Sequence, residues 1–189
     1  MSGNLMKSET IRSRVRVGVI GGARAKAGPL AQAYDVGRMI AGRGAILVCG
    51  GLAGIMEAAA RGAHEAGGLT VGILPGTQPA DANPHIDFAL ATGLGYSRNA
   101  LVAMNADVLI AIDGEYGTLS EIAYGMIYGK KVVGMGVTED STSQLLANAC
   151  NLFLFVDDIL QAATGAPAEA DEAAGRPEQA APAQSQISV

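Results

Sequence analysis

Three short apolar runs, each followed by a glycine-rich stretch, constrain the fold of this chain more than any other feature. The runs at residues 15–20, 45–49 and 107–112 lead into the sequences GGAR, GGLAG and DGEYGT. A longer stretch with helical spacing follows each of them. Apolar strands that alternate with helices are typical of a parallel sheet that is covered on both faces.

The same alternation extends along most of the chain. The predicted strands are residues 15–20, 45–49, 69–74, 86–90, 107–112, 131–135 and 152–156. The predicted helices are residues 30–43, with Pro29 in the first turn, 54–66, 97–105, 118–128 and 157–163. We therefore predict an α/β fold: a single Rossmann-like domain whose sheet is doubly wound and mainly parallel, with helices on both faces.

Composition divides the 189 residues into three zones. Residues 1–14 form a polar arm, and residues 15–164 form the Rossmann-like domain. Residues 165–189 are rich in Ala, Pro and Glu and hold almost no large apolar side chain. Such a segment buries too little surface to offset its loss of conformational entropy, so we predict a disordered tail.

Charge, cysteine content and hydropathy exclude several classes of protein. The net charge of −5 gives no general attraction to nucleic acid. Two cysteines, Cys49 and Cys150, are too few for a disulfide scaffold or a four-cysteine zinc site, and both are expected to be buried thiols. No run is long and apolar enough to span a bilayer, and the first residues do not resemble a secretory signal. We expect a cytoplasmic protein without a membrane partner.

The glycine-rich stretches predict where a ligand binds. The carboxyl ends of parallel strands meet at one edge of the sheet, where glycine permits close backbone approach and helix N-termini attract anions. The candidate cofactor-binding glycines are Gly21, Gly22, Gly50, Gly51, Gly54, Gly114 and Gly117. No Gly-x-Gly-x-x-Gly follows the first strand and no Walker A loop is present, so NAD is disfavoured. His64 and His85 lack the spacing of metal ligands, and no metal site is predicted.

Residues 113–121 (DGEYGTLSE) carry the most specific signal. Thr118 and Glu121 match a capping box, with Thr118 as the N-cap residue of the following helix. The same position places Glu121 at the ligand edge, where it can face Arg98 across a cleft. Such a pair can bind the polar atoms and phosphate of a ligand, or assist the cleavage of an N-glycosidic bond.

These motifs resemble those of the Lonely Guy superfamily of Rossmann-like proteins. The hallmark PGGxGTxxE of that superfamily corresponds to residues 113–121, and a second motif appears as CGGLAGIMEAAARGAHEAGG at residues 49–68. Arg98 fits the arginine that precedes the hallmark. A shorter branch, which includes the molybdenum cofactor carrier proteins, is more similar in the sequence of three segments: VGVIGG, GLGYSRN and YGTLSEIAYG.

The resemblance implies two functions. Lonely Guy enzymes release the base from nucleoside 5′-monophosphates, and their catalytic pair would fall on Arg98 and Glu121. Three departures weaken that assignment, because Asp113 replaces a Pro, Glu115 replaces a Gly and Asn99 replaces a basic residue.

We therefore predict a non-enzymatic carrier of a phosphate-bearing pterin or nucleotide-like cofactor, specifically the molybdenum cofactor. Arg98, Asn99, Thr118 and Glu121 would contact the cofactor beside the glycines. The alternatives are a phosphoribohydrolase and a nucleotide sensor. Implied partners are molybdoenzymes or cofactor-synthesis proteins, and a second copy of the chain in a homo-oligomer, either a dimer or a tetramer.

Overall fold

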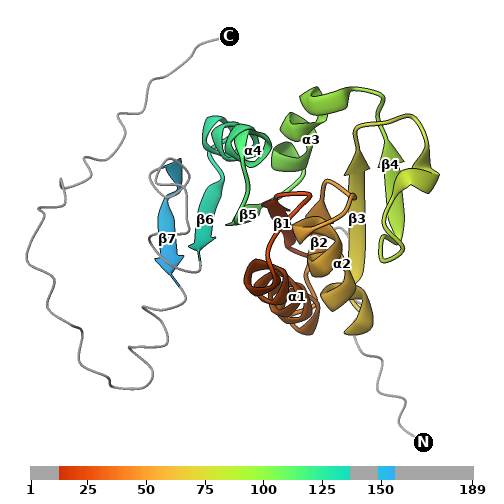
Figure 1. The fold of residues 1–189 in the computed structure, drawn as a ribbon, viewed down its shortest axis with the longest axis horizontal. Coiled ribbons are helices and arrows are strands. Elements are labelled where there is room, and N and C mark those ends of the chain that lie inside the picture. Colours follow the sequence, from red (N-terminus) through yellow and green to blue (C-terminus); the bar gives the residue numbers. More distant parts are fainter. Residues whose placement is uncertain (1–12, 137–148, 156–189) are drawn as a thin grey trace, which may run out of the picture.

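The computed structural model describes residues 13–136 and 149–155 (Figure 1). Its strands are β1 (Arg16–Gly21), β2 (Ile46–Cys49), β3 (Leu69–Leu74), β4 (Phe88–Ala91), β5 (Val108–Ile112), β6 (Lys131–Gly136) and β7 (Leu152–Phe155). Its α-helices are α1 (Ala27–Gly42), α2 (Ile55–Glu65), α3 (Asn99–Met104) and α4 (Tyr116–Ile127). Two short 3₁₀ helices, η2 (Pro79–Asp81) and η3 (Gly95–Arg98), complete the described part.

The seven strands form one sheet in the order β4-β3-β2-β1-β5-β6-β7, and every neighbouring pair is parallel. The order reverses between β1 and β5, so their carboxyl ends, Gly21 and Ile112, lie side by side at the switch point. A doubly wound sheet binds its ligand at this place. The predicted fold class is confirmed.

The core consists of two layers, one on each face of the sheet. Successive side chains of a strand point to opposite faces. Val19 and Cys49 therefore pack with α1 and α2, while Ile20 and Val48 pack with α3 and α4. Figure 1 shows the two pairs of helices on opposite sides of the sheet. Almost every strand residue is apolar because both faces are covered.

Both cysteines are buried, as the sequence predicts. Burial raises the pKa of the Cys49 thiol to about 12 and that of Cys150 to about 11. A thiol of such high pKa stays protonated and is a poor nucleophile.

Helices α1 and α2 approach so closely that each presents a glycine to the backbone of the other. A Cβ atom at Gly37 would fall on the carbonyl oxygen of Ala59, and a Cβ atom at Gly62 would fall on that of Tyr34. The start of α1 lies near the carboxyl end of β1 because only a short segment joins Gly21 to Ala27.

The predicted boundaries differ from the observed ones by a few residues at most elements. The segment predicted as helix 97–105 divides into η3 and α3, and the strand predicted at 86–90 is β4. The helix predicted at 157–163, the tail at 165–189 and residues 1–12 of the arm lie outside the described residues. None of the described helices combines the length and the hydropathy needed to cross a membrane.

Candidate functional site

A cleft of about 1020 Å³ opens at the switch point between β1 and β5. One wall is the segment that joins β1 to α1, and the other is the segment that joins β5 to α4. Eight of the predicted site residues line it: Gly21, Gly22, Arg98, Asn99, Gly114, Gly117, Thr118 and Glu121. The structure thus brings together residues that lie up to 100 positions apart in the sequence.

The other three predicted glycines do not line this cleft. A Cβ atom at Gly50 would lie 2.5 Å from Arg98 Nη2, so this glycine leaves room for the guanidinium. Gly54 has a φ of 71° and lies against the backbone of Gly22 and Ala23, while Gly51 faces β3. The stretch 50–54 therefore positions the first glycine loop and Arg98.

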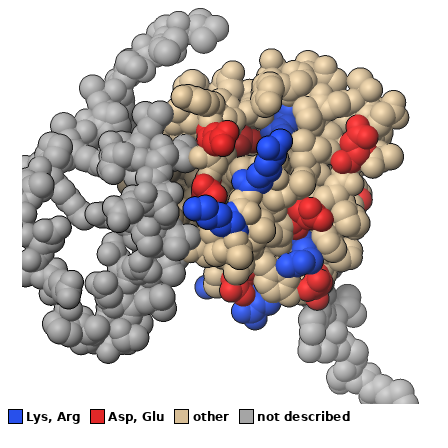
Figure 2. Space-filling view, viewed as in Figure 1, with Lys and Arg blue, Asp and Glu red and all other residues tan. Residues whose placement is uncertain are grey.

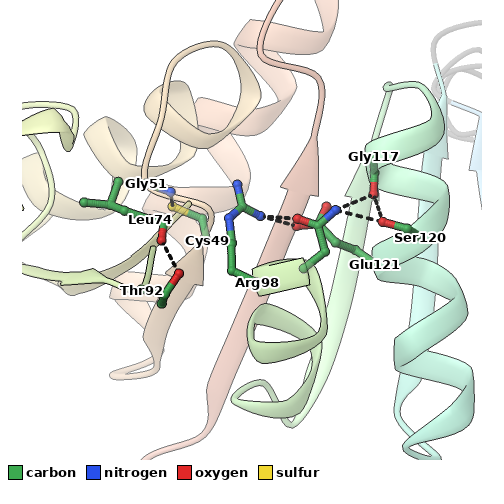
Figure 3. A network of polar contacts seen from close by, with 9 residues as sticks. Cys49, Gly51, Leu74, Thr92, Arg98, Gly117, Ser120 and Glu121 are labelled. Carbon is green, nitrogen blue, oxygen red and sulfur yellow. Dashed lines mark hydrogen bonds and ion pairs between the residues drawn. The ribbon is translucent and has the colours of Figure 1, made fainter. Parts of the chain in front are cut away.

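Four polar residues are buried in the floor of the cleft: Arg98, Asn99, Thr118 and Glu121. Arg98 Nη1 donates to Asn99 Oδ1 at 2.5 Å and to Glu121 Oε1 at 3.1 Å. Figure 3 shows Arg98 reaching from η3 across the carboxyl ends of the central strands to α4. The predicted pairing of Arg98 with Glu121 is present. It arises because α3, which precedes β5, packs against α4, which follows it.

Arg98 keeps a buried donor without a partner. The residue is only 7% exposed, and no described residue accepts a hydrogen bond from its Nε atom. An unpaired buried N–H group costs about 1–3 kcal/mol. Arg98 also lines the cleft, so its guanidinium offers a charged donor to an anionic or carbonyl oxygen.

Glu121 is 5% exposed, and burial raises its pKa to about 7, although the Arg98 charge and hydrogen bond act in the opposite direction. A carboxyl group with this pKa exchanges its proton near neutral pH. It can serve either as the partner of Arg98 or as a proton donor and acceptor.

The predicted capping box at Thr118 is wrong. Helix α4 begins at Tyr116, its N-cap residue is Glu115, and no cap hydrogen bond from a described side chain closes its start. Thr118 is thus inside the first turn, and the Glu121 carboxylate accepts from Arg98.

Asn99 links α3 to α4 through hydrogen bonds. Its Nδ2 donates to the carbonyl oxygen of Gly117 at 3.2 Å and to Ser120 Oγ at 2.8 Å. Ser120 Oγ in turn donates to the same carbonyl at 2.7 Å. Asn99, at the position after the arginine where the resemblance implies a basic residue, therefore holds the start of α4 and, with it, the cleft wall.

The first residue of the hallmark has an unusual backbone. Asp113 has a φ of 53°, which a Pro ring does not permit, and its Oδ1 accepts from the N–H of Gly114 at 2.7 Å. Gly114, at φ 120°, lies directly over Thr118, where a Cβ atom would overlap the threonine side chain. With Asp in place of Pro, the first amide of the loop, the N–H of Gly114, is already hydrogen-bonded to the side chain of Asp113.

Several cleft residues were not predicted from the sequence: Arg24, Lys26, Gln32, Tyr96, Asp113 and Glu115. Arg24 and Lys26 closely follow the first glycine pair, and this position in the sequence could have indicated that they lie at the ligand-binding edge. Gln32 interrupts the buried face of α1 formed by Pro29, Ala33 and Val36, and its Oε1 has no partner among the described residues. Tyr96 is 88% exposed and nothing in the sequence distinguishes it.

The histidines lie elsewhere. His64 Nδ1 is 3.2 Å from Asp87 Oδ1, at the edge of the sheet opposite the cleft, and its ring is 6.1 Å from that of His85. Within the described residues, no three His, Cys, Asp or Glu side chains are grouped so that they could hold a metal ion.

Comparison with solved structures reveals two similar cofactor proteins. The molybdenum cofactor binding protein from Rippkaea orientalis is 34% identical, with a TM-score of 0.69 over 80% of this chain and 96% of that one. The molybdenum cofactor carrier protein from Chlamydomonas reinhardtii is 31% identical, with a TM-score of 0.66 over 80% and 97%.

The chain is also similar to a curated relative. It is a probable cytokinin riboside 5′-monophosphate phosphoribohydrolase of Oryza sativa subsp. japonica, 36% identical over 93 residues. The match spans 48% of this chain and 38% of the rice protein.

These comparisons confirm the predicted resemblance to the Lonely Guy superfamily and to molybdenum cofactor carrier proteins. The model of the SLOG cluster4 family matches residues 14–158, which is nearly the whole predicted domain. This chain belongs to the SLOG cluster4 family.

Proposed function

We propose that this protein binds and carries a phosphate-bearing pterin or nucleotide-like cofactor, and that this cofactor is the molybdenum cofactor. The observation that carries the proposal is the cleft at the switch point, with a buried arginine that keeps a donor free. The two similar solved structures, at 31% and 34% identity over nearly their full length, support the choice of cofactor.

The residues of the cleft suit such a ligand. Its volume of about 1020 Å³ is at the upper end of the range of small-molecule sites. Gly21, Gly22, Gly114 and Gly117 would bring backbone close to the ligand, and the Arg98 guanidinium would donate to one of its oxygens. Molybdenum is held by the dithiolene of the pterin, so the carrier needs no metal-ligating side chains of its own.

The remaining site residues have supporting roles in this proposal. Asn99 and Thr118 supply directed polar contacts, and Glu121 orients Arg98 through the 3.1 Å hydrogen bond. The other three glycines, Gly50, Gly51 and Gly54, do not line the cleft. They position the floor and the first loop, because their backbone lies close to neighbouring segments.

Replacing Arg98 with Lys tests the proposal. Lysine keeps the charge but lacks the planar guanidinium with its several N–H donors, so we expect the variant to bind the molybdenum cofactor about tenfold more weakly, or worse. The measurement is an anaerobic titration of the full chain with cofactor released from a molybdoenzyme.

Arg16→Lys is the matched control. Arg16 also pairs with a carboxylate, with its Nη2 2.7 Å from Asp107 Oδ1, but at the opposite edge of the sheet. We expect its affinity to equal that of the wild type. Absence of saturable binding by wild type, or equal affinity of the Arg98→Lys protein, would contradict the proposal.

A phosphoribohydrolase activity is the second candidate. The buried Arg98–Glu121 pair favours it, because Glu121, with a pKa of about 7, can take up or release a proton in the cleft. The rice relative supports this possibility over the part of the chain that it matches.

The proposal extends to the assembly and the setting of the protein. A homo-oligomer, either a dimer or a tetramer, is favoured by apolar side chains that α3 and α4 expose, among them Met104, Tyr116 and Ile127. The molybdoenzymes that receive the cofactor, or the proteins that make it, would be its partners in the cytoplasm.

Figure 2 shows a face on which basic and acidic residues alternate, and such a face offers no basic patch to nucleic acid.

A further inference from the structure

The two walls of the cleft carry opposite charge. The basic wall is the segment 22–29, which contributes Arg24 and Lys26, and the acidic wall is the segment 113–118, which contributes Asp113 and Glu115. A phosphate dianion is attracted to the first wall and repelled by the second. The Lonely Guy hallmark, by contrast, would assign the phosphate to the segment 114–118.

The helix that starts in the basic wall is open to an anion. The N-cap residue of α1 is Lys26, whose side chain makes no cap hydrogen bond, and no acidic residue lies in its first turn. The first N–H groups of a helix lack intrahelical acceptors and carry partial positive charge. Gly28, in this first turn, lines the cleft together with Pro29.

The helix that starts in the acidic wall is less favourable for an anion. Its N-cap residue is Glu115, which lines the cleft and makes no cap hydrogen bond, so a negatively charged residue stands at the positive end of α4. The first turn of α4, like that of α1, holds no acidic residue. The carboxylate of Asp113 accepts the N–H of Gly114, which is the first amide of the loop. A phosphate at this wall would displace one carboxylate and lie beside another.

A third observation concerns the floor between the walls. The Arg98 guanidinium is buried there, with Nη1 bonded to Glu121 of α4, Nη2 close to Gly50 at the end of β2, and Nε unpartnered. Arg98 lines the same cleft as Gly28 and Pro29 in the first turn of α1, so one ligand in this cleft can contact both.

We infer that the anionic group of the ligand is bound at the start of α1 by Arg24, Lys26 and the helix N-terminus, and not at the start of α4. The inference rests on the proposed function, since it assumes a phosphate-bearing ligand in this cleft. The ligand would then lie with its phosphate toward α1 and its ring system over Arg98.

Three double variants test the inference. Arg24→Gln/Lys26→Gln removes the basic charges, and Asp113→Asn/Glu115→Gln removes the acidic ones. Arg43→Gln/Lys131→Gln is the control, because it removes two positive charges at the opposite edge of the sheet, from the end of α1 and the start of β6. The probes are a phosphorylated pterin and AMP, each compared with its dephosphorylated form.

We expect the Arg24→Gln/Lys26→Gln protein to bind the phosphorylated probes about 10- to 100-fold more weakly, which is the effect of removing two charge-assisted contacts. Its affinity for the dephosphorylated probes, and all affinities of the Arg43→Gln/Lys131→Gln protein, should stay within about threefold of wild type. The Asp113→Asn/Glu115→Gln protein should bind the phosphorylated probes as tightly as wild type or more tightly, because it loses the repulsion of the acidic wall. Wild-type affinity of the Arg24→Gln/Lys26→Gln protein for the phosphorylated probes would overturn the inference alone. If wild type binds neither probe, the proposed function fails and the inference fails with it.

Discussion

Replacing Gly37 with Ala lowers the free energy of unfolding by about 3 kcal/mol, while the same replacement at Gly42 raises it by about 0.5–1 kcal/mol. The two glycines lie in the same helix, α1. A Cβ atom at Gly37 would fall on the carbonyl oxygen of Ala59 in α2, so the helices must separate to admit it. A Cβ atom at Gly42 meets nothing within 4 Å.

Denaturant unfolding of the two variants beside wild type measures both effects. Helix propensity favours Ala over Gly at both positions, so its contribution cancels when the two variants are compared. Equal effects of the two replacements would show that the close contact of α1 with α2 is not present in the folded protein.

The Glu121→Gln protein should gain stability relative to wild type as the pH rises from 4.5 to 7. The carboxyl group has a pKa of about 7 in the folded chain and an ordinary value of 4.5 in the unfolded one. Below pH 4.5 both states hold the proton. Between these values the unfolded state releases it first, so the wild type loses about 3 kcal/mol, and the loss is complete above pH 7.

Glutamine does not titrate, so the difference between the two stability curves isolates Glu121. Denaturant unfolding at pH 4.5, 6 and 8 measures it, and Glu57→Gln, on α2 and outside the cleft, controls for the loss of one negative charge. Parallel curves for wild type and the Glu121→Gln protein would contradict the burial of this carboxyl group.

The fold could be predicted from the sequence because its signals are local. Each strand is an apolar run, and each of the three glycine-rich stretches follows a strand, so the alternation gives a parallel sheet and the edge where ligands bind. The pairing of Arg98 with Glu121 followed from their positions at that edge.

The details of the cleft depend on tertiary contacts that the sequence does not display. Gly50 and Gly54 share the pattern of the other glycines, yet their space is filled by Arg98 and by the backbone of Gly22 and Ala23. Thr118 and Glu121 fit a capping box, but α4 begins two residues earlier than Thr118 and Arg98 pairs with the carboxylate. Long-range packing decided both outcomes.

The most direct test of the central claim is to incubate the full chain with nucleoside 5′-monophosphates and with the molybdenum cofactor, and to identify bound and free compounds by chromatography. A carrier retains the cofactor and returns every nucleotide intact, which is the result that we predict. Release of free base by wild type, abolished in the Glu121→Gln protein, would contradict the carrier function and identify a phosphoribohydrolase.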